Sequence, residues 1–543
     1  MLSSTRVLFL AMDAGDKFLI QKWAGDGTLP YIGSLMGTGL VGETMSLEGF
    51  YEGSTWPSFY TGVTPANHGF HSLTQLNPGT YKFYCCYPGS FIKQEPFWNY
   101  LSAAGSRVAI LDIPLSGVSR GLNGIQMVEW ASHDGVYGFH TWPENLKWEV
   151  LTRFGRHPVK RSCDSYRRTL NDFRSFRNRL IKGVQKKTEL TIHYLKKGDW
   201  DFFAQVFSEC HCVGHQCWHL HDPHHPSYNP ETAYAIGDPI RDVYKAIDAG
   251  IGKILASVDK DIIIFFLASH RMAHAFSGYF LLADILKKLN LLTKRPSSAI
   301  NYKSSSQIRK IYNFLIQSWR KIPETIRTPF EPPLFSLHDW IVDQVNARER
   351  PTLPPDVKNV DPNTSKCFQV INGNAVSGIR INLAGREPNG FIQPGREFDN
   401  LIQQLSTDLL SIIDCETGKP LIKGVKKTSQ LYEGEQIDHL PDLLIEWNDD
   451  KSLGNINLAE GKGSRLRIFS ERFGVLEGIN AYVRTGDHRP EGLFIVHGPG
   501  IKAIRVERTI SIMDFAPTFA KLLGANMPQV DGRPIIEILQ MVG

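Results

Sequence analysis

The stretch VLFLAMD (residues 7–13) indicates the class of fold. Its first six residues are continuously apolar rather than alternating, which is typical of a strand buried on both faces of a parallel sheet. Asp13 stands at the carboxyl end of this strand, where parallel α/β sheets carry their functional sites. We therefore treat Asp13 as a candidate site residue, with capping of a following helix as the alternative.

The same pattern returns along the chain, separated by segments with helical spacing. Further buried strands are expected at 106–113, 200–207, 261–268, 378–382, 441–446 and 492–497. Helices are expected at 17–36, 97–104, 145–196, 238–257 and 397–413, and loops at 120–140 and 485–490. The basic run within 145–196, which includes Lys187, is typical of a solvated helix face. Alternating strands and helices predict an α/β fold, a three-layer α/β/α sandwich around a mostly parallel sheet.

Residues 287–366 differ in composition from the rest. Proline and lysine increase there, apolar periodicity weakens, and Pro-Pro pairs occur at 332–333 and 354–355. We predict an inserted lid or cap at 287–366, between the two parts of a catalytic core at 1–286 and 367–543.

The overall composition excludes several classes of protein. The 543 residues carry a net charge of only +5, without the clustered basic face of a nucleic-acid binder. No apolar run reaches the ~20 residues that span a bilayer, and the N-terminus lacks the features of a signal peptide. Eight cysteines in this length do not form a disulfide framework. We expect a soluble, cytoplasmic protein with no nucleic-acid polymer or membrane as partner; the oligomeric state is left open.

The stretch GSTWPSFYTG (residues 53–62) contains a candidate nucleophile. Pro57 is tolerated in a first helical turn, so a helix is expected to start near Trp56. Its free N–H groups and positive dipole end would then face a small-molecule anionic ester bound beside Thr55. A helix-capping role for the hydroxyl is the alternative.

Histidines provide the other candidate site residues. Six of the 18 histidines lie within residues 211–225, and His211 and His215 are four positions apart. On a helix these two would share a face and could hold one metal ion, whereas exposure to solvent is the alternative. His270 follows an expected strand and His488 lies in an expected loop. Together with Asp13 and Thr55, they suit one or two divalent ions, with zinc favoured and manganese or iron as alternatives.

These residues resemble the alkaline phosphatase superfamily, in particular the type I phosphodiesterase/nucleotide pyrophosphatase-like proteins of the predicted phosphohydrolase/phosphomutase group. The resemblance implies an alkaline phosphatase-like fold over most of the chain. The motifs that carry it, in chain order, are Leu10–Asp13, Ser54–Pro57, Thr61–Gly62, Pro65, His68–Gly69, Phe207–Glu209, Gly214–His215, Trp218, His225–Pro226, Ser269–His270, Gly378–Asn382, Gly385–Pro388, Pro441–Leu443, Gly486–Pro490 and Asp514–Thr518.

The resemblance also implies roles for individual residues. It assigns Thr55 as the nucleophile, and divides the ligands between two metal ions: Asp13, Thr55 and the Ser269–His270 pair for one, and His211, His215 and His488 for the other. The chain departs from the family pattern at positions 211 and 269, where the pattern has Asp. Three states follow: two metals, one metal at the three histidines, or a chemically repurposed site. Replacement ligands to consider are Glu209, His274 and Asp16.

The implied activity is that of a metal-dependent hydrolase or transferase acting on a phosphoric ester through Thr55, with a phosphodiester favoured by the family branch. Arg380, Arg386 and Arg489 are candidates for binding the substrate anion, and ion pairing within the fold is their alternative. Two other functions stay open: a single-metal enzyme acting on a sulfuryl or carbamoyl ester, and a non-catalytic member that binds a ligand.

Overall fold

A computed structural model describes residues 5–130, 138–159, 169–294, 360–458 and 461–542. Its largest element is a nine-stranded sheet in the order β20-β2-β19-β9-β1-β8-β5-β6-β7. The bounds are β1 (Val7–Met12), β2 (Leu40–Met45), β5 (Val108–Leu111), β6 (Gly124–Val128), β7 (His140–Trp142), β8 (Phe202–Phe207), β9 (Ile263–Ala268), β19 (Glu491–His497) and β20 (Ile510–Ser511). β1 lies at the centre and pairs in parallel with both β8 and β9. β19 runs antiparallel to β9 and β2, and β7 antiparallel to β6, so the sheet is mostly parallel as predicted.

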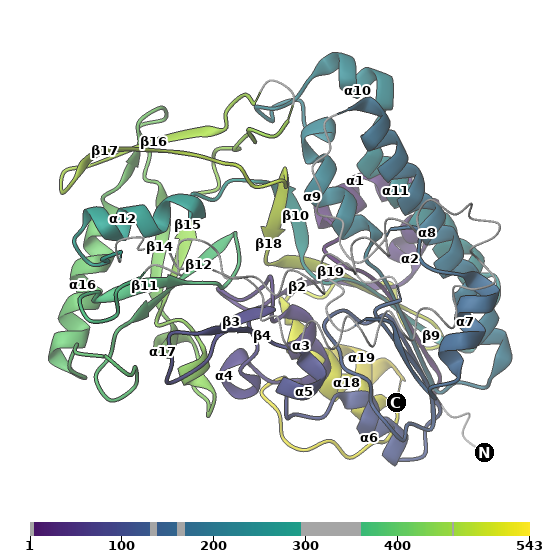
Figure 1. The fold of residues 1–543 in the computed structure, drawn as a ribbon. Coiled ribbons are helices and arrows are strands. Elements are labelled where there is room, and N and C mark those ends of the chain that lie inside the picture. The colour runs from purple at the N-terminus through teal and green to yellow at the C-terminus, as the bar shows by residue number, and fades with distance from the viewer. Residues whose placement is uncertain (1–4, 131–137, 160–168, 295–359, 459–460, 543) are drawn as a thin grey trace, which may run out of the picture.

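Helices cover both faces of this sheet, because successive side chains of β1 point to opposite sides. Leu8, Leu10 and Met12 join one apolar cluster, and Val7, Phe9 and Ala11 join the other. The first cluster includes α1 (Lys17–Gly25), α2 (Pro30–Thr38), α8 (Leu170–Lys197), α9 (Glu209–His221) and α11 (Pro239–Leu255). The second includes α3 (Thr55–Thr61), α6 (Phe97–Ala103), α18 (Phe515–Leu522) and α19 (Ile536–Val542). Figure 1 shows the two layers, and the predicted α/β/α sandwich is confirmed.

Four local expectations were wrong. The expected helix at 145–196 contains α7 (Leu146–Phe154), non-helical residues at 155–159 and most of α8. The expected helix at 17–36 is two helices, divided at a turn where Gly27 has a φ of 80°. The expected loop at 120–140 contains β6 and the start of β7, and a buried Gln126 in β6 hid the apolar pattern. The expected loop at 485–490 contains β18 (Gly486–Arg489), which pairs with β10 (Arg271–His274). That pairing joins segments more than 200 residues apart, so local sequence gave no signal for it.

A second group of sheets lies beside the large one, on the left of Figure 1. Its antiparallel four-stranded sheet has the order β11-β12-β15-β14, and a three-stranded sheet has the order β13-β16-β17. The strands are β11 (Cys367–Val370), β12 (Val376–Ile381), β13 (Ile413–Asp414), β14 (Ile422–Lys427), β15 (Leu443–Trp447), β16 (Arg465–Ser470) and β17 (Gly474–Ile479). The associated helices are α12 (Leu282–Lys288), α16 (Arg396–Leu410) and α17 (Thr428–Leu431). Most of the expected lid, residues 295–359, lies outside the described residues, so its boundaries stay a prediction.

Several shorter strands and α-helices are also present. They are β3 (Thr74–Leu76), β4 (Phe83–Cys85), α4 (Pro65–His68), α5 (Pro88–Phe91), α7 (Leu146–Phe154) and α10 (Pro230–Ile236). Within the described ranges, none of the helices combines the length and apolar character needed to cross a bilayer.

Candidate active site

The expected pair of histidines lies on α9, which begins directly after β8. His211 and His215 are one turn apart on this helix and both are buried. The third histidine, His488, comes from β18, which packs against α9. This packing requires close approach of two backbones, because a Cβ on Gly486 would lie 2.3 Å from the carbonyl oxygen of Gly214. Glycine at 486 therefore allows the strand to bring His488 to the helix.

The three histidines present the same ring atom to one point. Nε2 of His211 lies 2.8 Å from Nε2 of His215 and 3.1 Å from Nε2 of His488. Their ligand atoms form a group within 4.8 Å of one another. Zinc bound tetrahedrally at 2.0–2.1 Å would hold its nitrogens about 3.3 Å apart. The donor set and its spacing therefore fit a divalent ion of the zinc type.

The opposite ring nitrogens of the three histidines also have partners. Nδ1 of His211 lies 2.8 Å from Oδ2 of Asp13, and Nδ1 of His215 lies 2.8 Å from the carbonyl oxygen of Gly486. Nδ1 of His488 lies 3.0 Å from Nε2 of His270. The expected residues Asp13 and His270 are thus brought to the cluster, and each contacts one of its histidines.

Burial and charge set the ionisation of these two residues. Burial raises the pKa of Asp13, but His211 and His270 together with the indole N–H of Trp56 more than offset it, so the net pKa is lowered. Burial lowers the pKa of His270 to about 4, even though Asp13 acts in the opposite direction. At neutral pH the site therefore contains a carboxylate and a neutral imidazole.

Thr55 is the first residue of α3, as the sequence predicted, and is buried. Its hydroxyl donates to the carbonyl oxygen of Tyr51 at 2.7 Å and makes a short hydrogen bond with the hydroxyl of Ser46. The neighbouring Trp56 donates its indole N–H to Oδ1 of Asp13 at 2.8 Å. The start of α3 is thus tied to Asp13, and the N–H groups of Thr55 and Trp56 in its first turn have no acceptor within the helix.

The candidate arginines are engaged in ion pairs within the fold. Arg386 makes two hydrogen bonds of 2.7 Å to Asp442, and Arg380 donates to Glu387 at 2.6 Å. Arg489 follows His488 in β18, but its Nε donates to Asp449 at 3.0 Å and its guanidinium lies 3.8 Å from the ring centre of Phe276.

Two groups of charged residues were not recognised from sequence. Lys187 is fully buried rather than solvated, and contacts Glu209 at the start of α9. Its position three residues from Val184 and from Leu190, which are both buried and apolar, was the available signal. In the second group, Glu52 and Asp487 lie with His488, and burial together with Asp487 raises the pKa of Glu52 to about 8.

Two of the replacement ligands considered have other partners. Glu209 contacts Lys187, and the side chain of Asp16 caps α1.

Comparisons with known proteins identify the family of this chain. Among solved structures, the chain is similar to the murine ectonucleotide pyrophosphatase/phosphodiesterase 5 in complex with AMP, with 11% identity, a TM-score of 0.47 and 99% of each chain covered. It is also similar to phosphonoacetate hydrolase from Sinorhizobium meliloti in complex with phosphonoacetate, with 12% identity, a TM-score of 0.49, and 96% of this chain and 95% of that chain covered. No curated protein matches. The family model for type I phosphodiesterase/nucleotide pyrophosphatase matches residues 7–331, and the chain therefore belongs to that family.

Proposed function

We propose that this protein is a metal-dependent hydrolase of a phosphoric ester, with a phosphodiester as the favoured substrate and Thr55 as the nucleophile. The observation that carries the proposal is the convergence of three buried Nε2 atoms from His211, His215 and His488. The family match to phosphodiesterases supports the class of substrate. The position of Thr55 at the start of α3, joined to Asp13 through Trp56, supports its role.

The chemistry divides between the bound ion and the chain. A divalent ion held by the three histidines would act as a Lewis acid on a phosphoryl oxygen. The first-turn N–H groups of α3 would donate to the other anionic oxygens of the substrate. Thr55 Oγ1 would form a bond to phosphorus while the bond to the leaving ester oxygen breaks, and the hydroxyl proton of Thr55 would pass through solvent water to the leaving oxygen. Water would then form a bond to phosphorus as the bond between Thr55 Oγ1 and phosphorus breaks, and one proton of that water would restore the threonine hydroxyl. The contacts to Tyr51 and Ser46 hold the hydroxyl at the helix start before reaction.

The test is turnover of p-nitrophenyl phosphate and bis(p-nitrophenyl) phosphate by chelator-treated protein, with and without added zinc or manganese. We expect metal-stimulated release of p-nitrophenol, faster from the diester. Thr55→Ala should lower kcat by about 10³-fold or more while leaving metal content unchanged, since removal of a nucleophile typically has effects of that order. Thr38→Ala, at an exposed threonine of α2, is the matched control and should keep wild-type turnover.

Two results would contradict the proposal. One is an unchanged rate in Thr55→Ala, and the other is the absence of turnover on both esters with either metal. Faster cleavage of p-nitrophenyl sulfate than of either phosphate ester would identify sulfuric esters, instead of phosphoric esters, as the substrate class.

A further inference from the structure

We propose that Asp13 and His270 are positioning residues for a single metal ion bound by His211, His215 and His488, rather than ligands of a second ion. This inference rests on the metal centre of the proposed function. It differs from the division of ligands that the family resemblance implies, and it follows from how hydrogen atoms must be placed on the rings.

A histidine that binds a metal ion through Nε2 carries its proton on Nδ1 and donates it to a neighbour. Each of the three histidines has an acceptor in the required place. His211 faces the carboxylate of Asp13, His215 faces the carbonyl of Gly486, and His488 faces Nε2 of His270. Each of the three rings thus has a partner for Nδ1 among the described residues, while the ligand atoms of the three lie within 4.8 Å of one another.

The hydrogen bonds of His270 leave it no lone pair for a metal ion. If His488 donates from Nδ1, Nε2 of His270 must be the acceptor, and the proton of a neutral His270 is then on Nδ1. Nδ1 of His270 lies 3.0 Å from the hydroxyl oxygen of Ser269, which accepts a hydrogen bond from this N–H. Ser269 therefore completes a chain of hydrogen bonds that fixes the ring of His488.

Asp13 is held by donors on both carboxylate oxygens. Oδ2 accepts from His211 and Oδ1 accepts from the indole of Trp56, and its backbone carbonyl accepts from the thiol of Cys210 at 3.0 Å. A second cation on Asp13 would compete with these donors. A carboxylate on the outer nitrogen of a ligand histidine raises the basicity of the ring and fixes its orientation.

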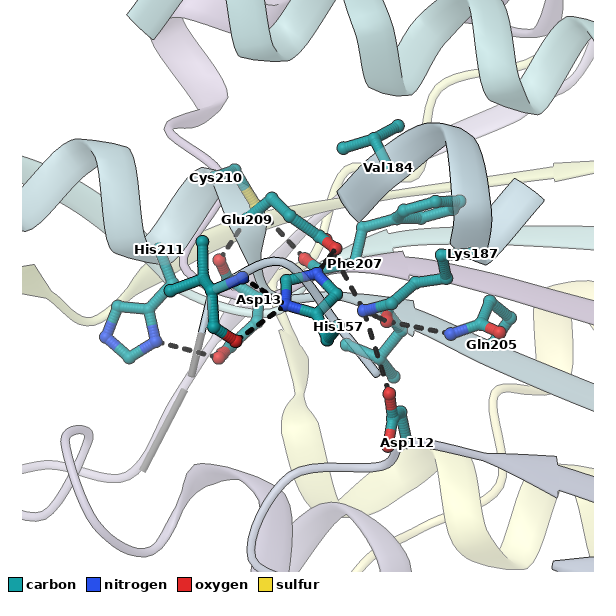
Figure 2. A network of polar contacts seen from close by, with 12 residues as sticks. Asp13, Asp112, His157, Val184, Lys187, Gln205, Phe207, Glu209, Cys210 and His211 are labelled. Atoms are coloured by element: carbon teal, nitrogen blue, oxygen red, sulfur yellow. Dashed lines mark hydrogen bonds and ion pairs between the residues drawn. The ribbon is translucent and has the colours of Figure 1, made fainter. Parts of the chain in front are cut away.

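Figure 2 shows the arrangement around His211 and Glu209, two residues apart on α9. His211 is turned toward Asp13, whereas Glu209 is turned the other way, toward His157 and Lys187. The substitution of His for the family's Asp at 211 thus places a ring nitrogen beside Asp13. In this chain, Asp13 supports a ligand instead of acting as one.

The test measures metal binding to the full-length, metal-free protein by titration with zinc and by elemental analysis after dialysis. We expect one ion per wild-type chain. Asp13→Asn and His270→Ala should still bind one ion, with affinity lowered by about 10–100-fold, the usual effect of losing such a partner. Asp26→Asn and His224→Ala change an exposed residue of each type and should bind as wild type does.

A spectroscopic measurement separates positioning from a merely structural role. With ¹¹³Cd and ¹⁵N-labelled histidine, we expect one cadmium signal, coupled to Nε2 of His211, His215 and His488 and not to His270. Two ions per wild-type chain, a second cadmium signal, coupling to His270, or unchanged affinity in both variants would overturn the inference. Binding of one ion without ester turnover would contradict the proposed function alone, and turnover with two bound ions would contradict this inference alone.

Discussion

Lys187 provides a sharp test of how α9 is held in place. Its ammonium is fully buried, donates to the carbonyl oxygen of Val206 at 2.8 Å, and lies 3.4 Å from Glu209 and 3.9 Å from Asp112. Both carboxylates are also buried, and Figure 2 shows the ammonium between them. Burial raises the pKa of Glu209, but Lys187 and His157 more than offset it and keep the net pKa lowered. The positive charge of Lys187 therefore compensates the negative charges of two buried carboxylates at the point where α9 begins.

Lys187→Met removes that compensation without removing the bulk of the side chain. Loss of one partner from a buried ion pair typically destabilises by about 3–5 kcal/mol. This is a large part of the roughly 5–15 kcal/mol that holds a native protein. We expect a lower melting temperature by circular dichroism and a lower urea midpoint. Lys182→Met, at an exposed lysine of the same helix, should change stability by no more than about 0.5 kcal/mol.

The double variant Lys187→Met/Glu209→Gln identifies the cause of the loss. Removing the charge of Glu209 should recover part of the stability lost in Lys187→Met, because one uncompensated carboxylate is gone. The reasoning is refuted if Lys187→Met unfolds at the same temperature and urea concentration as Lys182→Met.

Three further predictions concern other parts of the fold. Gly486→Ala should weaken zinc binding, measured by titration of the metal-free protein, because the added Cβ would push β18 away from α9. Gly25→Ala is the control and should leave zinc binding unchanged, because a Cβ there meets nothing within 4 Å. His68 accepts a hydrogen bond from the N–H of Phe70, and burial lowers the pKa of His68 from 6.5 to about 3. The contribution of His68 to stability is therefore complete above pH 6.5 and is lost as pH falls toward 3. His68→Gln should therefore show a shallower fall in melting temperature between pH 7 and 5, and an equal fall would contradict this. Arg386→Lys should lower stability by about 1–3 kcal/mol, since lysine cannot replace a bidentate ion pair, and should leave KM unchanged; a raised KM at unchanged stability would assign it to substrate binding instead.

Much of the sheet could be predicted because its central strands are continuously apolar. β1, β8 and β9 all show this local pattern, and Asp13 and His270 follow two of them. The spacing of His211 and His215 likewise indicated that both would share one face if their segment formed a helix, and α9 is that helix. These features depend on residues close together in the chain, so the sequence carries them directly.

Features set by contacts between distant segments could not be predicted. β18 forms because it pairs with β10, and only this pairing explains how His488 reaches α9. Lys187 belongs to a run of basic residues that is otherwise typical of a solvated face, yet carboxylates from β8–α9 and from the end of β5 surround it. The partner of each Asp13 oxygen depends on distances of about 3 Å between separate elements, which no spacing in the sequence encodes.

The most direct test of the central claim is an anomalous-scattering map of zinc-loaded crystals, recorded at the zinc absorption edge. We predict one strong peak about 2.0–2.1 Å from Nε2 of His211, His215 and His488. A peak bound directly by Asp13 or His270, or no peak among the three Nε2 atoms, would contradict the account.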